Sequence, residues 1–252
     1  MSLFCYKCGT ELPEDAVYCF KCGTKAIRSY SAVKEMSSED EDKGPTPGST
    51  ITFGSYVQNE AEPTPIEWIV LERSEGTALL IARYCLECRL FHDSSSGVNW
   101  AESDLRLWLN DYFFNNAFTE EERSQIARTH LVNDNNPQTG TPGGPQTDDY
   151  IFCLSVSESK YYFDPDYVNK YGETVNRFRA ARVTDHAKAN GADPCEDTSE
   201  WYGGNGLYWL RTPGARPSFA CFVNYAGKID TDGEFAFRTD LYAVRPALRV
   251  KF

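Results

Sequence analysis

Two cysteine pairs near the start of the chain decide how its first domain folds: residues 4–9 read FCYKCG and residues 18–23 read YCFKCG. In each stretch a glycine follows the Cys-x-x-Cys pair and tolerates the positive φ of a tight turn. Two such turns present the thiolates of Cys5, Cys8, Cys19 and Cys22 to a single ion. Because four thiolates close the tetrahedral shell of zinc, the spacing predicts one structural Zn²⁺ ion on which the folding of residues 1–28 depends.

The same residues resemble the short zinc-ribbon domain that is common at the N-terminus of bacterial proteins. The likeness covers residues 3–26 and rests on the cysteine pairs with their flanking aromatic and glycine residues. Ribbons of this fold bind nucleic acid, proteins or no known partner. The resemblance therefore implies the metal and leaves the partner open.

The chain of 252 residues is acidic, with a formal net charge of −12 and a sequence pI of about 4.8. Between the cysteine pairs lie Glu11, Glu14 and Asp15 and no basic residue. An acidic surface repels phosphate backbones and anionic lipids, which disfavours nucleic-acid and membrane partners. Nucleic-acid binding through the ribbon is kept as an alternative function.

Other sequence features bear on the compartment. No apolar run approaches the roughly 18 residues that span a bilayer, so we expect no membrane span. The N-terminus lacks the basic start and long apolar region of a secretory signal, and we expect a cytoplasmic, reducing compartment.

Cys85 and Cys88 form a third Cys-x-x-Cys pair, but no further pair follows nearby. We interpret both as core residues rather than half of a metal or redox site.

Composition divides the rest of the chain. Residues 29–50 include the acidic and Pro/Gly/Ser-rich run Ser37–Ser49, which predicts a flexible linker. Aromatic and aliphatic residues recur throughout residues 51–252, which we predict to form one large domain. One long polar stretch, Asn133–Asp149, interrupts it. Such a loop is either functional or disordered, and we predict disorder.

Strands and helices are both expected in the large domain. Ile66–Glu72 and Ala78–Arg83 predict a β-hairpin that turns at residues 74–76. Tyr150–Leu154 predicts a further strand. The chain from Leu207 onward predicts strands with turns at residues 226–227 and 232–233.

Three helices are predicted. The first spans Ser103–Asn116 with Ser103 as its N-cap, and the second opens with a capping box at Thr119–Glu122 and ends near Arg128. The third runs from about Arg179 to Ala189 and is ended by Gly191. The fold class is therefore α+β. The first helix is expected to bury one face, made of Leu105, Trp108, Leu109 and Tyr112.

The large domain contains the motifs ITFGSY (residues 51–56), IEWIVL (66–71), WLRTPG (209–214) and VRPAL (244–248). Together they resemble a bacterial domain family of unknown function that often follows zinc ribbons. The order of the later motifs also resembles C-type-lectin-like folds. That second resemblance implies a twisted antiparallel sheet flanked by helices, with the first and last strands paired.

Two active branches of the C-type-lectin-like fold do not match this chain. Calcium-dependent sugar binders share a Glu-Pro-Asn or Gln-Pro-Asp loop and a Trp-Asn-Asp strand, and neither is present. No calcium site is therefore expected. Oxidases of similar fold hold copper with two late cysteines, whereas only Cys221 lies in the final strands here.

Large side chains in the motifs favour structural roles. We predict that Trp68, Trp108 and Trp209 anchor the core. Arg211 and Arg245 are expected to be buried against carboxylates, or else to line a ligand site. The carboxylates proposed for this pairing are Glu67, Glu102 and Asp104.

The leading hypothesis is a non-enzymatic binding protein that presents loops of its C-terminal half to a protein or a small molecule. Residues 201–240 concentrate the residue types that dominate binding surfaces. The alternative is an enzyme with a dispersed site built from His92, Asp185, His186 and Arg211. The residues expected to form the binding face are Trp201, Tyr202, Arg216, Tyr225 and Arg238.

Overall fold

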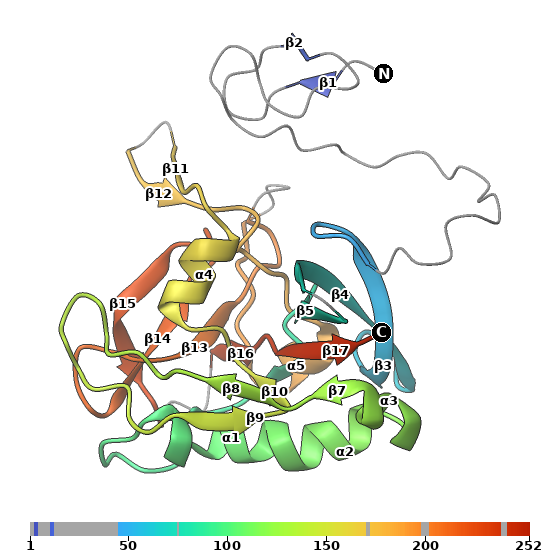
Figure 1. The fold of residues 1–252 in the computed structure, drawn as a ribbon. Coiled ribbons are helices and arrows are strands. Elements are labelled where there is room, and N and C mark those ends of the chain that lie inside the picture. Colours follow the sequence, from blue (N-terminus) through green and yellow to red (C-terminus); the bar gives the residue numbers. More distant parts are fainter. Residues whose placement is uncertain are drawn as a thin grey trace. The chain divides into compact units, whose positions relative to one another are not determined.

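The computed structural model describes residues 3–4, 11–12, 45–74, 76–169, 172–197, 202–237 and 241–252 (Figure 1). The chain divides into two units, Met1–Lys43 and Gly44–Phe252. In the first unit, β1 (Leu3–Phe4) and β2 (Glu11–Leu12) pair in antiparallel fashion. The four cysteines predicted to bind zinc lie outside the described residues.

The described part of the second unit contains two large sheets and two further pairs of short strands (Figure 1). In the first sheet, all pairs are antiparallel, and β7 also pairs with β17. The predicted hairpin corresponds to β4 and β5, and its buried residues are Ile66, Trp68, Val70 and the run Ala78–Ala82. The order is β10 (Ile151–Phe152), β17 (Ala247–Lys251), β5 (Thr77–Ala82), β4 (Pro63–Ser74) and β3 (Thr50–Val57), with β7 at Ile126–Ala127.

The ends of this sheet differ from two expectations. The first strand β3 and the last strand β17 share the sheet, but β4 and β5 separate them, so they do not pair with each other. The sheet also extends into the segment predicted as linker, because the Gly48 N–H donates to the Val70 carbonyl at 2.8 Å and β3 begins at Thr50.

The second sheet has five strands, and its β13–β16 pair is parallel. The predicted turn at residues 226–227 connects β14 and β15, with Gly227 at φ +75°. The turn predicted at residues 232–233 is wrong, since Gly233 lies inside β15 and opposite an irregularity in its pairing. The order is β15 (Ile229–Phe235), β14 (Phe219–Val223), β13 (Leu207–Pro213), β16 (Tyr242–Val244) and β6 (Glu87–Cys88).

Arg245 joins the two sheets. It stands between β16 of one sheet and β17 of the other, and it is 2% exposed. Its Nε donates to the Ala82 carbonyl, and its Nη1 donates to the Arg179 carbonyl, both at 2.8 Å. Its guanidinium also lies over the ring of Tyr208. The arginine is structural, but carbonyls and a ring take the place of the predicted carboxylate.

Arg211 is buried against a carboxylate that the sequence analysis did not name. Its guanidinium makes a two-pronged ion pair with Glu158, one prong at 2.8 Å, and its Nη1 also donates to the Cys153 carbonyl. The three predicted partners are engaged elsewhere: Glu67 with Arg83, Glu102 with Asn99, and Asp104 with His92.

The predicted first helix is present as α1 (Asp104–Trp108), a π turn η2 (Leu109–Phe113) and α2 (Phe114–Ala117), with Ser103 as N-cap. Its buried face differs from the expected one, because Tyr112 is 55% exposed and Trp108 is half-buried. A spacing of four residues drifts around a regular α-helix of 3.6 residues per turn, and the wider π turn offsets that drift. The buried positions are Leu105, Leu109, Phe113 and Ala117.

Local signals explain the other helices. The predicted capping box at Thr119–Glu122 is formed, but α3 (Glu120–Gln125) ends before Ile126, which joins β7. The third predicted helix, α5 (Asp185–Ala189), begins six residues later than Arg179, where Thr184 supplies the N-cap. A fourth helix, α4 (Val156–Tyr162), was not predicted. In the described part of the chain, no helix combines the length and hydropathy needed to cross a bilayer.

The prediction of disorder in Asn133–Asp149 is wrong. The hairpin of β8 (Thr129–Leu131) and β9 (Thr147–Asp149) closes this loop, and Asn136 near its start is 1% exposed. The Asn136 amide donates to the carbonyls of Pro213 and Thr231, each at 2.8 Å. Polar side chains thus supply the ordering contacts that apolar residues were expected to provide.

Candidate ligand pocket

A pocket of about 350 Å³ opens on the second unit. Its volume lies at the small end of the range of about 300–1,000 Å³ found for small-molecule sites. Four segments that are distant in sequence supply its walls: β3, the chain at β6, the helix of α1 and η2, and α5 with its C-cap. The lining residues are Tyr56, Val57, Glu87, Arg89, Trp108, Tyr112, His186 and Asn190.

Glu87 is the buried charge of this pocket, with 6% of the residue exposed. One carboxylate oxygen accepts from the Tyr56 hydroxyl at 2.8 Å and lies 3.1 Å from Nε2 of His186. The other accepts from the Asn190 amide at 2.6 Å and from the Cys88 N–H at 3.0 Å. Both oxygens are therefore engaged, which compensates the cost of burying the charge.

The Glu87 carboxylate affects the protonation of the Tyr56 hydroxyl beside it. Burial, and then the nearby charge of Glu87, raise the pKa of Tyr56 well above its usual range, so the phenol stays protonated and donates. Nε2 of His186 lies 3.1 Å from a Glu87 oxygen and 3.0 Å from the amide nitrogen of Asn190, so it faces both an acceptor and a donor.

The fold holds α5 against the pocket. The Thr184 hydroxyl accepts from the Ala187 N–H at 3.1 Å and caps the helix. The His186 N–H donates to the Gln58 carbonyl at 2.8 Å, which ties the helix to the loop after β3. His186 and Asn190 stand four residues apart, so both reach Glu87 from one face.

Aromatic and cationic side chains form the rim of the pocket. The Arg89 guanidinium lies 4.8 Å from the ring centroid of Trp108. Trp108 in turn stacks on Tyr112, with ring centroids 6.2 Å apart and planes 20° apart. The π turn η2 leaves Tyr112 out of the core, and its exposed ring borders the pocket.

The described residues of the predicted binding face do not line this pocket. Arg216 is exposed before β14, with its guanidinium over the ring of Phe219. Tyr225 is half-buried after β14 and donates to Asp193 at 2.9 Å. The two flank a strand of five residues, about 17 Å long. Tyr202 is half-buried before β13, and Trp201 and Arg238 lie outside the described residues.

The dispersed enzymatic site is not assembled in the pocket. Of its four residues, only His186 lines the pocket. Arg211 is occupied by Glu158, and His92 lies beside Asp104. Sequence reasoning missed Glu87 and Asn190. A glutamate inside the apolar run around β6, and an asparagine four residues after His186, were the available signals.

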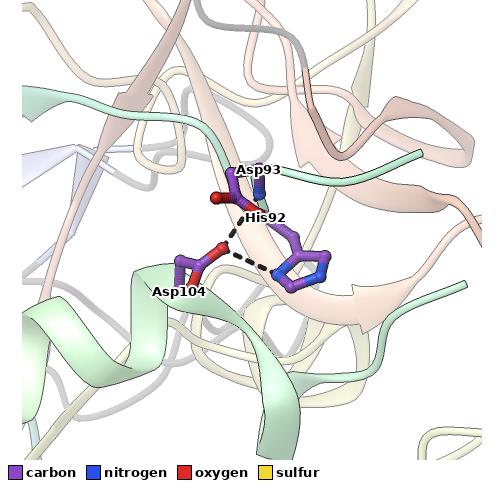
Figure 2. A group of neighbouring side chains, drawn as sticks. All are labelled: His92, Asp93 and Asp104. Atoms are coloured by element: carbon purple, nitrogen blue, oxygen red, sulfur yellow. Dashed lines mark hydrogen bonds and ion pairs between the residues drawn. The ribbon is translucent and has the colours of Figure 1, made fainter. Parts of the chain in front are cut away.

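Figure 2 shows a second polar group, His92, Asp93 and Asp104, whose ligand-type atoms lie within 4.8 Å of one another. His92 Nδ1 is 2.8 Å from an Asp104 oxygen, but the contact falls outside hydrogen-bond geometry and Nδ1 is shielded from water. The same oxygen accepts from the Asp93 N–H at 2.9 Å. Asp104 also begins α1, where a negative charge is favourable. We interpret the group as a set of polar contacts that holds the start of α1.

The buried thiols are unsuited to catalysis. Burial raises the pKa of Cys85 and of Cys153 to about 12 in each case. Cys85 and Cys88 are both buried in the core, as the sequence analysis expected. A thiol with so high a pKa carries almost no thiolate near neutral pH, and it is therefore a poor nucleophile or metal ligand.

Comparison with known families agrees with the expected arrangement of domains. Residues 4–26 match the family described as zinc-ribbon domain, and residues 75–252 match the family described as Domain of unknown function (DUF6273). No curated protein and no solved structure matches the chain.

Proposed function

The chain belongs to that family of unknown function (DUF6273), whose description states no activity, and we propose that it is a non-enzymatic binding protein. A structural zinc ribbon at residues 1–28 is tethered by the linker that follows it to a binding domain, which lies within the second unit at residues 44–252. The binding domain takes up a small molecule in the pocket around Glu87.

The observation that carries this proposal is the set of contacts that Glu87 makes with the protein. All of its four contacts come from the protein itself, so the pocket is formed before any ligand arrives. A preformed concave site with an aromatic rim is typical of small-molecule binding. Glu87 itself is unsuited to act as a general base, because both of its oxygens are occupied by protein groups.

We propose a C-type-lectin-like architecture for the binding domain. In its support, the C-terminal strand β17 returns to the middle of the sheet that begins the domain. The domain is α+β, and its first sheet is antiparallel throughout. The helices α1 and α2 continue one another along one side of the unit (Figure 1).

Zinc belongs to the proposal as well. The zinc-ribbon match at residues 4–26 contains Cys5, Cys8, Cys19 and Cys22, which would hold one ion in a closed shell. The free thiols of the second unit are compatible with a reducing, cytoplasmic compartment. No further metal is needed by the proposed binding function.

Filling the pocket tests the proposal. Val57 lines it from the end of β3, and Val57→Trp would occupy its space with a side chain suited to a strand. Val168→Trp is the matched control, because Val168 lies in β11 (Tyr167–Val168) and is 72% exposed. A fragment library is screened by saturation-transfer NMR. Fragments should bind the parent and the control and fail to bind Val57→Trp, whereas fragments indifferent to Val57→Trp would contradict the proposal.

The predicted face at residues 201–240 remains a candidate surface for a protein partner. Among the residues of this face that the structure describes, Arg216 is exposed. A Trp201→Ala, Arg216→Ala double variant should keep the stability of the parent and lose a partner recovered with the parent chain. Recovery of the same partner by the variant would exclude this face.

A further inference from the structure

Arg89 is the arginine among the residues that line the pocket. Many arginines of the second unit have a carboxylate partner, whereas among the described residues Arg89 contacts the Trp108 ring and no carboxylate. Its side chain is nevertheless exposed at the pocket. The arginines with carboxylate partners are Arg83, Arg106, Arg179, Arg211 and Arg249.

Glu87 and Arg89 form no direct ion pair with each other, although both line the pocket. The Glu87 oxygens are directed to Tyr56, Asn190, His186 and the Cys88 N–H. The guanidinium therefore keeps its five N–H donors for a ligand. Its contact with the Trp108 ring restricts the side chain, which reduces the entropy lost when an anion binds.

The net charge of the whole chain makes an exposed arginine at a pocket a stronger indication of an anionic ligand. At a net charge of −12, the surface as a whole repels anions, so an anion binds only where a local cation is directed at it. Arginine suits planar oxyanions because its fork makes two parallel hydrogen bonds to them.

The other half of the rim is an exposed aromatic ring. Tyr112 is 55% exposed, yet it stacks on Trp108 beside Arg89. Stacking of a flat ligand on the exposed face of such a ring is favourable, because it removes apolar surface from water. The rim thus places a cation and a flat apolar surface next to each other.

We propose that the ligand of this pocket is a small planar ring compound that carries a carboxylate. The carboxylate pairs with the guanidinium of Arg89, and the ring lies against Tyr112. The inference rests on the proposed function, since it names the class of ligand for the same pocket.

Benzoate and benzamide test the inference, because they differ in the anionic group and share the ring. Each is titrated into the full chain with its zinc, and the Trp108 indole N–H and the Arg89 Nε–H are followed by ¹H–¹⁵N NMR. Benzoate should bind at least about 10-fold more tightly than benzamide, and added salt should reduce the difference.

Two variants test whether Arg89 causes the difference in affinity between benzoate and benzamide. Arg89→Gln should reduce benzoate to the affinity of benzamide. Arg83→Gln is the control, because Arg83 is also an exposed arginine beside an aromatic ring, that of Tyr84, but does not line the pocket. It should leave both affinities unchanged.

The outcomes separate the inference from the proposed function. If benzamide shifts the pocket resonances at the same concentrations as benzoate, the pocket stands and the carboxylate inference is overturned. If Arg83→Gln weakens benzoate as much as Arg89→Gln does, the inference is also overturned, because the effect is then one of general charge. If neither compound shifts the pocket resonances, both the inference and the pocket function fail.

Discussion

The hydroxyl of Tyr56 donates a 2.8 Å hydrogen bond to the carboxylate of Glu87, and both residues are buried. Tyr56 comes from the first strand of one sheet and Glu87 from an edge strand of the other. The bond therefore links the two sheets at the floor of the pocket. Its removal should affect both stability and the order of the pocket.

Tyr56→Phe removes the hydroxyl and keeps the ring. Because it leaves a buried carboxylate one donor short, we expect the free energy of unfolding to fall by about 1–3 kcal/mol. Tyr112→Phe is the matched control, since that ring is 55% exposed, and it should change stability by less than about 0.5 kcal/mol. Urea denaturation measures both, and equal effects would contradict the role assigned to the Tyr56 hydroxyl.

Arg211→Ala tests the buried ion pair. It removes the Arg211 donors from the partly exposed Glu158 carboxylate and from the Cys153 carbonyl, so we expect a loss of about 1.5–3 kcal/mol. The exposed pair of Arg83 and Glu67 provides the comparison, and Arg83→Ala should cost less than about 1 kcal/mol. Similar losses in the two variants would show that the Arg211 pair is not a buried structural contact.

Asn136→Ala should loosen the polar loop. The variant deprives the Pro213 and Thr231 carbonyls of a donor, and we expect a cost of about 1–3 kcal/mol. Limited proteolysis should then cut within Asn133–Asp149 faster than in the parent. The same cutting rate in both proteins would mean that Asn136 does not order the loop.

His130 should show a raised pKa in the folded protein. Hydrogen bonds to Asp148 and Gln146 raise the pKa of this exposed ring above its usual value of 6.5. The protonated ring is therefore favoured by folding, so its contribution is present below the unfolded pKa and is lost as the pH rises through the folded pKa. In Asp148→Asn, NMR titration should give a pKa closer to 6.5. An unchanged pKa would contradict the assigned cause.

Cys19→Ser should remove the zinc. Elemental analysis should give one equivalent in the parent and none in the variant, because three thiolates no longer close the shell. The thermal transition of the second unit should stay nearly unchanged, since residues 29–50 separate it from the ribbon. A cooperative loss of both units would contradict the proposed division into domains.

Sequence reasoning succeeded where the determining contacts are local. Ser103 and the Thr119–Glu122 box identified two helix starts, because a cap lies within one turn of the groups it satisfies. The start of α4 carries a box of the same kind at Ser155 and Glu158, which the sequence analysis passed over. The end of α3 was misplaced because pairing of Ile126 with β17 overrides local propensity.

The pocket could not be predicted in the same way. Glu87, Tyr56 and His186 meet only after the two sheets and α5 have packed. The partner of Arg211 was missed for a similar reason, since Glu158 is brought to it by α4. The polar loop was misjudged because its order depends on hydrogen bonds to β13 and β15, which composition does not reveal.

A crystal structure of the full chain grown with benzoate tests the central claim most directly. The account predicts benzoate in the pocket, with its carboxylate within hydrogen-bond distance of the Arg89 guanidinium and its ring against Tyr112. An empty pocket at a saturating benzoate concentration, or benzoate bound away from Arg89, would contradict it.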